Sequence, residues 1–226
     1  MSDGPLVDTS WAERAVARSP VVQRSRQRSI EQTERIVRAA MRLVEQKGSA
    51  FTIQELAKKA RVALQTFYRQ FAGKDELLLA VIEWTIADAT ATFRTAAQQL
   101  PDPISRLRFY ITTIFSSLAD PRSGRQRQFI TSEHYRLQQL FPEELSAAVR
   151  AYTDLLVPEI EAAQAAGLLA PSDIQSDASF VTELVMATYH HYAFVAPPGP
   201  TSELSESIWQ FCVRALGGGD AATTAR

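Results

Sequence analysis

Residues 52–78, "TIQELAKKARVALQTFYRQFAGKDELL", contain two short helical patterns joined by a tight break. Thr52 and Glu55 have the capping-box spacing that starts a helix. A second helix is expected from Leu64 to about Phe71. Two short helices joined by a tight turn, after a longer helix, are typical of a helix-turn-helix. The residues expected to form the small core between them are Leu56, Ala57, Val62, Phe67 and Phe71.

The second short helix is predicted to present a polar and aromatic face to solvent. An α-helix fits the major groove of B-DNA, where amide and hydroxyl groups bond base edges. Gln65 and Thr66 are therefore expected to contact bases. Outside such a motif, the same two residues would be interpreted as ordinary solvated residues of a helix. Tyrosine, arginine and lysine beside the groove can hold phosphates. The candidates for that role are Tyr68, Arg69 and Lys74.

The charge of the chain is unevenly distributed although its net value is −1. Residues 24–74 hold twelve Lys or Arg against four Asp or Glu, a balance of +8. Residues 75–226 hold ten against eighteen, a balance of −8. A basic segment joined to an acidic one indicates that the first meets a polyanion, the alternative being chance segregation of solvated charge.

The first 29 residues are expected to form a basic, partly flexible arm. Ser10 and Glu13 have capping-box spacing, so a short helix is predicted there, and Pro20 would end it. Arginines in such arms can enter a minor groove, or they can be disordered and solvated, and the sequence leaves both readings open. The arginines concerned most directly are Arg24, Arg26 and Arg28.

Helical periodicity continues through the rest of the chain, and no convincing alternating strand pattern interrupts it. The fold class is therefore predicted as all-α. Helices are expected over about 30–47, 74–98, 103–118, 124–140, 142–166, 174–195 and 203–216. The sequence therefore divides into three regions: an arm at 1–29, a helix-turn-helix domain at 30–74, and a larger helical domain at 75–226.

The stretch "TIQELAKKARVALQTFYRQFAGKDELLLAVI" resembles the N-terminal DNA-binding domain of the TetR family of transcriptional regulators. The resemblance is strong over about residues 30–85, and beyond them only the number and lengths of the helices agree. The segment that matches most tightly is "TFYRQFAGKDELL". Members of the family are typically homodimeric repressors that a ligand releases from palindromic operators.

Carried over by residue, the resemblance implies a phosphate contact at Thr52 and at Lys74, base contacts at Leu64, Gln65 and Thr66, and groove-edge contacts at Tyr68 and Arg69. It also implies that the last two helices form a four-helix dimer interface and that a ligand cavity lies among the helices before them.

Two positions depart from the family pattern. Arg61 stands where a turn glycine is usual, and a left-handed residue with a Cβ costs about 1 kcal/mol. A phosphate contact by Arg61 is the hypothesis that would offset this cost. Ala63 stands where Ser or Thr usually caps the recognition helix, and a lost cap costs about 1 kcal/mol. That helix is therefore expected to order fully only on DNA.

The C-terminal aromatic residues are mostly expected in the core, with some of them lining a pocket for an apolar or amphipathic ligand. The residues chosen as ligand-binding candidates are Phe115, Phe129, Tyr152 and His190. No metal site or cofactor is expected, because the histidines lack partners at ligand spacing. The single cysteine, Cys212, is expected to lie in the core or at an interface.

The sequence shows no signal peptide, no membrane span and no catalytic motif, so we expect a cytoplasmic protein that is not an enzyme. Three functions are compatible with these features. The first is a dimeric, ligand-responsive regulator, most simply a repressor. The second is a DNA-binding protein of the same fold without an effector. The third is a helical enzyme or binding protein whose basic N-terminal region is incidental.

Overall fold

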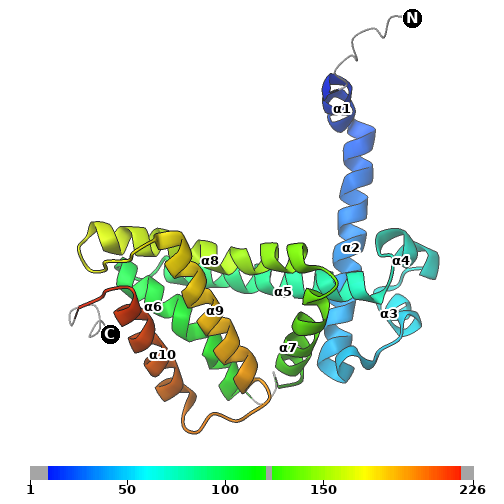
Figure 1. Ribbon diagram of the computed structural model, residues 1–226. Coiled ribbons are helices and arrows are strands. Elements are labelled where there is room, and N and C mark those ends of the chain that lie inside the picture. Colours follow the sequence, from blue (N-terminus) through cyan, green and yellow to red (C-terminus); the bar gives the residue numbers. More distant parts are fainter. Residues whose placement is uncertain (1–9, 121–123, 220–226) are drawn as a thin grey trace, which may run out of the picture.

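The computed structural model describes residues 10–120 and 124–219, and these contain helices and turns but no strand (Figure 1). The all-α prediction is confirmed. The α-helices are α1 (Ser10–Ala17), α2 (Pro20–Lys47), α3 (Ile53–Ala60), α4 (Leu64–Gln70), α5 (Lys74–Ala97), α6 (Pro103–Thr113), α7 (Gly124–Gln138), α8 (Pro142–Ala165), α9 (Ile174–Tyr192) and α10 (Thr201–Ala215), with 3-10 turns η1 (Gly48–Ala50) and η2 (Ile114–Ala119).

The N-terminal arm differs from the prediction, because residues 20–29 are helical. Proline is favoured in the first turn of a helix, where its missing N–H is not needed. Pro20 therefore opens α2 as well as following the end of α1. The first part of α2, residues 20–30, projects away from the rest of the molecule, and we call it the spur (Figure 1). Residues 1–9 of the expected arm lie outside the described part of the chain.

Helices α2, α3 and α4 form a three-helix head. Four of the five residues predicted for its core are buried, namely Leu56, Ala57, Phe67 and Phe71, and the fifth, Val62, is half-buried. The rings of Phe67 and Phe71 are stacked 5.6 Å apart. Besides residues of α5, three buried residues of later helices join this cluster: Phe129 and Leu137 of α7, and Leu145 of α8. The head is therefore packed directly against the C-terminal helices.

Helices α5 to α10 form a second, larger body. Its core includes the fully buried Trp209, Phe115 and Leu107. Helix α5 belongs to both units, because residues 77–82 pack into the head core whereas Ala97 packs into the body core. The predicted division at residue 74 thus falls at the first residue of the helix that joins the two units.

Local signals set several helix ends as expected. Asp102 caps α6 by accepting a hydrogen bond from the Ser105 amide, and Pro103 follows it. Gly167 ends α8 with a φ of 71°, a conformation that glycine adopts without strain. Pro158 lies inside α8. None of the helices in the described residues is long and apolar enough to cross a membrane.

Candidate nucleic-acid interface and cavities

Helix α4 presents the outward face that its sequence predicts. Phe67 is fully buried, whereas Tyr68 on the next position of the helix is 55% exposed. Leu64, Gln65 and Arg69 are also exposed, and Thr66 is half-buried. The side chains that this short helix offers to a partner are therefore an amide, a hydroxyl, a phenol and a guanidinium.

At the turn before α4, Arg61 has the left-handed backbone expected of a turn glycine, and Ala63 leaves the helix without a side-chain cap. Arg61 has φ 55° and ψ 46°, and in the described residues it is the only non-glycine with a positive φ. The amide of Val62 closes this turn on the carbonyl of Ala57, 3.0 Å away. Ala63 occupies the N-cap of α4 and provides no side-chain hydrogen bond.

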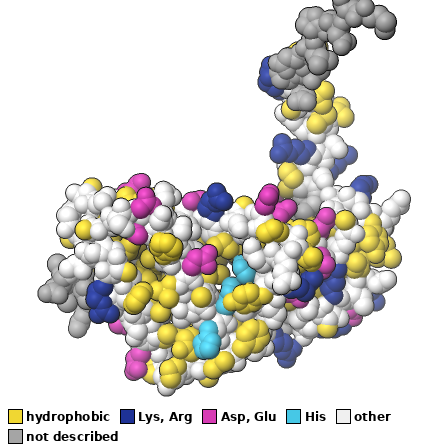
Figure 2. Space-filling view, viewed as in Figure 1, with side chains coloured by type: hydrophobic (Ala, Val, Ile, Leu, Met, Phe, Trp, Pro, Cys, Tyr) yellow, Lys and Arg dark blue, Asp and Glu magenta, His cyan; other side chains and the backbone are white. Residues whose placement is uncertain are grey.

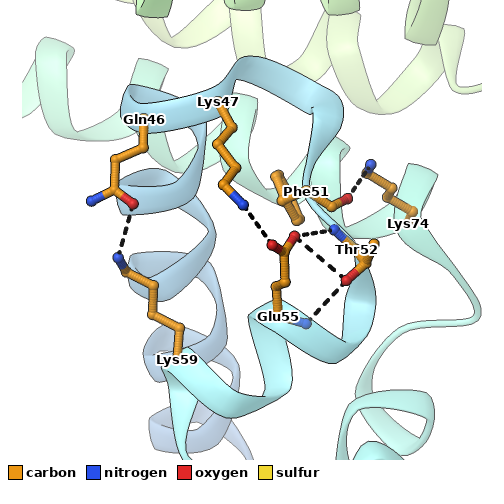
Figure 3. Close-up of polar contacts among 7 residues, drawn as sticks. All are labelled: Gln46, Lys47, Phe51, Thr52, Glu55, Lys59 and Lys74. Atoms are coloured by element: carbon orange, nitrogen blue, oxygen red, sulfur yellow. Dashed lines mark hydrogen bonds and ion pairs between the residues drawn. The ribbon is translucent and has the colours of Figure 1, made fainter.

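The start of α3 is fixed by a network of side chains (Figure 3). Thr52 and Glu55 form a complete capping box, in which the Glu55 amide donates to Thr52 Oγ1 over 3.1 Å. Lys47 of α2 donates to the Glu55 carboxylate and holds its pKa below the usual value. Lys59 reaches back to Gln46. These contacts fix the angle between α3 and α2.

Lys74 connects the first turn of α5 to the same region (Figure 3). Its ammonium donates to the carbonyls of Ser49 and Phe51, and it lies 4.6 Å from the centroid of the Phe51 ring. An ammonium has three donors, so two backbone bonds leave one for a phosphate.

The C-terminal end of α4 is held by α2. Gln32 accepts hydrogen bonds from Arg69 and Gln70, while Gln70 accepts from Ser29 and Thr33. Arg69 is therefore already positioned by a neutral partner, which leaves its charge available to a phosphate. The sequence did not predict these hydrogen bonds between α2 and α4. Ser, Gln and Thr on a helix surface give the same sequence pattern whether they bond another helix or only water.

The spur arginines are exposed. Arg24 and Arg28 are four residues apart and so share one side of α2, whereas Arg26 lies on a different side. Arg24 also donates to the carbonyl of Pro20, one turn earlier in the helix.

Comparison with known proteins identifies this arrangement. Residues 36–81, from the middle of α2 into α5, match the sequence model described as "Bacterial regulatory proteins, tetR family". The HTH-type transcriptional regulator EthR of Mycolicibacterium smegmatis is 27% identical over 179 residues, which are 77% of this chain and 82% of EthR. These likenesses support a transcriptional regulator of the TetR family.

Two solved structures extend the likeness beyond the head. Thermus thermophilus FadR, a TetR-family repressor in complex with lauroyl-CoA, has a TM-score of 0.63 at 22% identity, covering 81% of this chain and 94% of FadR. RolR in complex with resorcinol has a TM-score of 0.64 at 15% identity, covering 88% of this chain and 96% of RolR. At these identities the likeness concerns the fold.

Two neighbouring hollows lie in the body. The first is an apolar cavity of about 260 Å³ between α5, the η2 region, α7, α8 and α9. Its lining includes Ile86 and Phe93 of α5, Tyr152 of α8, and Tyr189 of α9. The hydroxyl of Tyr152 is satisfied by the carbonyl of Tyr110, at 2.7 Å, so the cavity wall is well suited to hydrocarbon.

The second hollow is a polar cleft of about 600 Å³ between α7, α8 and α9. His134 and His190 lie side by side in it, with ring centroids 5.0 Å apart. Burial lowers the pKa of His190 to about 4, helped by repulsion from His134, and burial also lowers the pKa of His134. Both imidazoles are therefore neutral at pH 7.

The four ligand-binding candidates are not brought together. Tyr152 lines the apolar cavity and His190 lines the polar cleft. Phe115 is fully buried in the body core, and Phe129 packs in the head core beside a separate hollow. An aromatic residue looks the same in sequence whether it fills a core or lines a cavity, so periodicity alone did not separate these roles.

The outer face of α9 and α10 is apolar and exposed. Phe180 of α9 is 69% exposed and Phe211 of α10 is 57% exposed, and both border a hollow of about 160 Å³. Figure 2 shows hydrophobic side chains gathered over these two helices. Cys212, next to Phe211, is buried instead, and burial raises the pKa of its thiol to about 12.

Proposed function

We propose that this TetR-family chain is a dimeric repressor that binds a palindromic operator and leaves it when a small apolar or amphipathic ligand occupies the body. Two heads grip successive major grooves about 34 Å apart. A ligand favours a body conformation with a different separation of the heads, so that both no longer dock together. The site of action is the cytoplasm, where such an operator is found, and the proposed role requires no catalysis and no membrane.

Operator recognition is assigned to α4 and its surroundings. Gln65 and Thr66 contact base edges, with Leu64 against an apolar group of a base. Phosphates are held by Thr52, Arg61, Tyr68, Arg69 and Lys74, and the spur carries Arg24, Arg26 and Arg28 to flanking DNA. Most of these groups are exposed around a buried Phe67, while Thr66 and Lys74 are half-buried, and this arrangement supports the assignment.

The observation that carries the ligand response is the course of α5. Its first residue, Lys74, is bonded to the loop before α3, and its middle section, including Ile86 and Phe93, lines the apolar cavity. A ligand that displaces α5 therefore acts on the head through one continuous helix. The FadR and RolR structures, which hold lauroyl-CoA and resorcinol, support the idea that such a body accommodates small molecules.

Helix α7 supplies a second connection between body and head. Arg136 pairs with Asp75 in the first turn of α5 at 2.8 Å, and Arg125 donates to the carbonyl of Gln46 at the end of α2. The same helix contributes His134 to the polar cleft. Both hollows are thus bordered by helices that touch the head.

The apolar face of α9 and α10 is assigned to the homodimer interface. Exposed phenylalanines such as Phe180 and Phe211 favour burial against another apolar surface, and a two-fold axis lets the same patch serve both subunits.

Fluorescence anisotropy with the duplex upstream of the chain's own gene, against a scrambled duplex at two salt concentrations, tests this function. The expected result is preferential, salt-tolerant binding with two protomers per site, and release by an apolar ligand. Tight binding that no ligand relieves would favour a constitutive regulator. Equal, salt-sensitive binding, followed by a random-sequence selection that enriches no site, would exclude operator recognition.

A further inference from the structure

The apolar cavity and the polar cleft share one wall. Val149 of α8 and Met186 of α9 line both hollows. Each helix then repeats the same arrangement one turn later. Three residues on, Tyr152 and Tyr189 face the apolar cavity. Four residues on, Thr153 and His190 face the polar cleft. Consecutive helical residues point about 100° apart, which explains how one pair of helices serves two compartments.

The inner end of the cleft offers hydrogen-bond groups without enough partners. The Thr182 hydroxyl donates to the carbonyl of Ala178 at 2.9 Å, and it lies 3.0 Å from the Thr153 hydroxyl. Because a hydroxyl has one proton, Thr153 is the donor in that pair, and its remaining lone pair can accept a bond. His190 is only 5% exposed, and its Nε2 has no hydrogen-bond partner.

The charged groups of the cleft lie at its rim. Arg150, Asp154 and Glu183 are exposed, whereas Thr153 and His190 are buried. Burial that keeps His190 neutral penalises any ion placed beside it, whatever its sign. The inner end therefore suits an uncharged group that both donates and accepts hydrogen bonds, such as a hydroxyl.

We propose that the two hollows hold one effector, whose hydrocarbon part occupies the apolar cavity and whose uncharged hydroxyl group bonds Thr153 Oγ1 and His190 Nε2. Met186, which is unbranched and flexible, moves aside to join the compartments. This inference deepens the proposed function by naming the class of effector, a neutral amphiphilic alcohol or phenol, and it rests on that function for its regulatory meaning.

The test is a direct binding measurement on the full-length protein without DNA. Isothermal titration calorimetry compares 1-octanol, octanoate and octylamine, which share a chain and differ in charge. The expected order places 1-octanol first. His190→Phe keeps a ring of similar size and Thr153→Val keeps the shape, and each is expected to weaken 1-octanol binding about 3- to 10-fold, as for one lost hydrogen bond.

His191→Phe is the matched control, because His191 is the next residue of α9 and is exposed rather than buried. Its affinity for 1-octanol is expected to equal that of the unmodified protein. Circular dichroism of all three variants verifies that they are folded. Tighter binding of octanoate or octylamine than of 1-octanol would overturn the proposal, as would no binding of 1-octanol at all. It would also be overturned if the His190→Phe and Thr153→Val variants bound 1-octanol as tightly as the unmodified protein does.

Measuring operator affinity with and without each ligand distinguishes failure of this inference from failure of the proposed repressor function. In one outcome, 1-octanol binds most tightly of the three ligands and still leaves operator affinity unchanged. That result would support the binding site proposed here and contradict ligand-induced release of the operator. If only charged ligands bind the body and release the operator, the ligand response stands and the neutral alcohol is excluded.

Discussion

Lys74, the first residue of α5, donates a hydrogen bond to the carbonyl of Phe51, with 2.7 Å between Nζ and O. Phe51 directly precedes Thr52, which caps α3. The helix that lines the apolar cavity is therefore bonded to the residue that leads into the helix-turn-helix. A shift of α5 cannot leave the start of α3 in place unless this bond breaks.

Lys74→Ala is expected to affect both folding and DNA binding. Loss of two charge-assisted bonds to carbonyls lowers the free energy of unfolding by about 1–2 kcal/mol, measured by urea denaturation. DNA binding weakens for every sequence, and the slope of log affinity against log salt falls by about one charge. Lys58→Ala, which removes the charge of an exposed side chain of α3, is the control for stability. An unchanged salt slope in Lys74→Ala would show that Lys74 holds the backbone and not a phosphate.

Arg61→Gly separates backbone strain from a DNA contact. Arg61 adopts φ 55°, so glycine relieves left-handed strain, and part of the gain is lost to the greater freedom of glycine in the unfolded chain. The free energy of unfolding is expected to rise by about 0.5–1 kcal/mol. Operator affinity is expected to fall, with a smaller salt slope. Unchanged affinity in anisotropy titrations would remove the phosphate role from Arg61.

Ala63→Ser is expected to order the recognition helix before it meets DNA. Ala63 has φ −69° and ψ 151°, the extended geometry of an N-cap, so a serine hydroxyl there can accept from an amide of the first turn of α4. Such a cap stabilises by about 1 kcal/mol. Slower hydrogen exchange in α4 and tighter operator binding are the expected results. Exchange rates equal to those of the unmodified protein would mean that the helix is already ordered.

Phe211→Glu is expected to convert the dimer to monomers without unfolding the subunit. The side chain is exposed on the subunit, so a charge there costs little until a second apolar face must cover it. Sedimentation velocity gives the oligomeric state. Leu140→Glu, at an exposed apolar residue after α7, serves as the control and stays dimeric. A dimeric Phe211→Glu protein would place the interface elsewhere.

The helix-turn-helix was predictable because its signals are local. The Thr52 capping box and the spacing of Phe67 and Phe71 each depend on residues a few positions apart. The start of α2 was not predicted. Pro20 was interpreted as the end of one helix, although the same residue is well suited to begin the next.

The ligand-binding candidates could not be predicted reliably from local sequence patterns. Phe129 was assigned to a cavity because it lies in the C-terminal part of the chain, yet it packs with the head. Tyr152 and His190 do face hollows, but the wall that Val149 and Met186 share depends on how α8 and α9 cross. No spacing within either helix encodes that crossing.

The most direct test of the account measures base discrimination by α4. The operator is selected from random duplexes, and anisotropy titrations then compare the unmodified protein with Gln65→Ala on that site and on all its single-base variants. Base reading by Gln65 predicts a loss of about 1–3 kcal/mol on the best site, with discrimination flattened at one base position in each half-site. An equal weakening on every duplex, with the pattern of discrimination unchanged, would contradict base reading by Gln65.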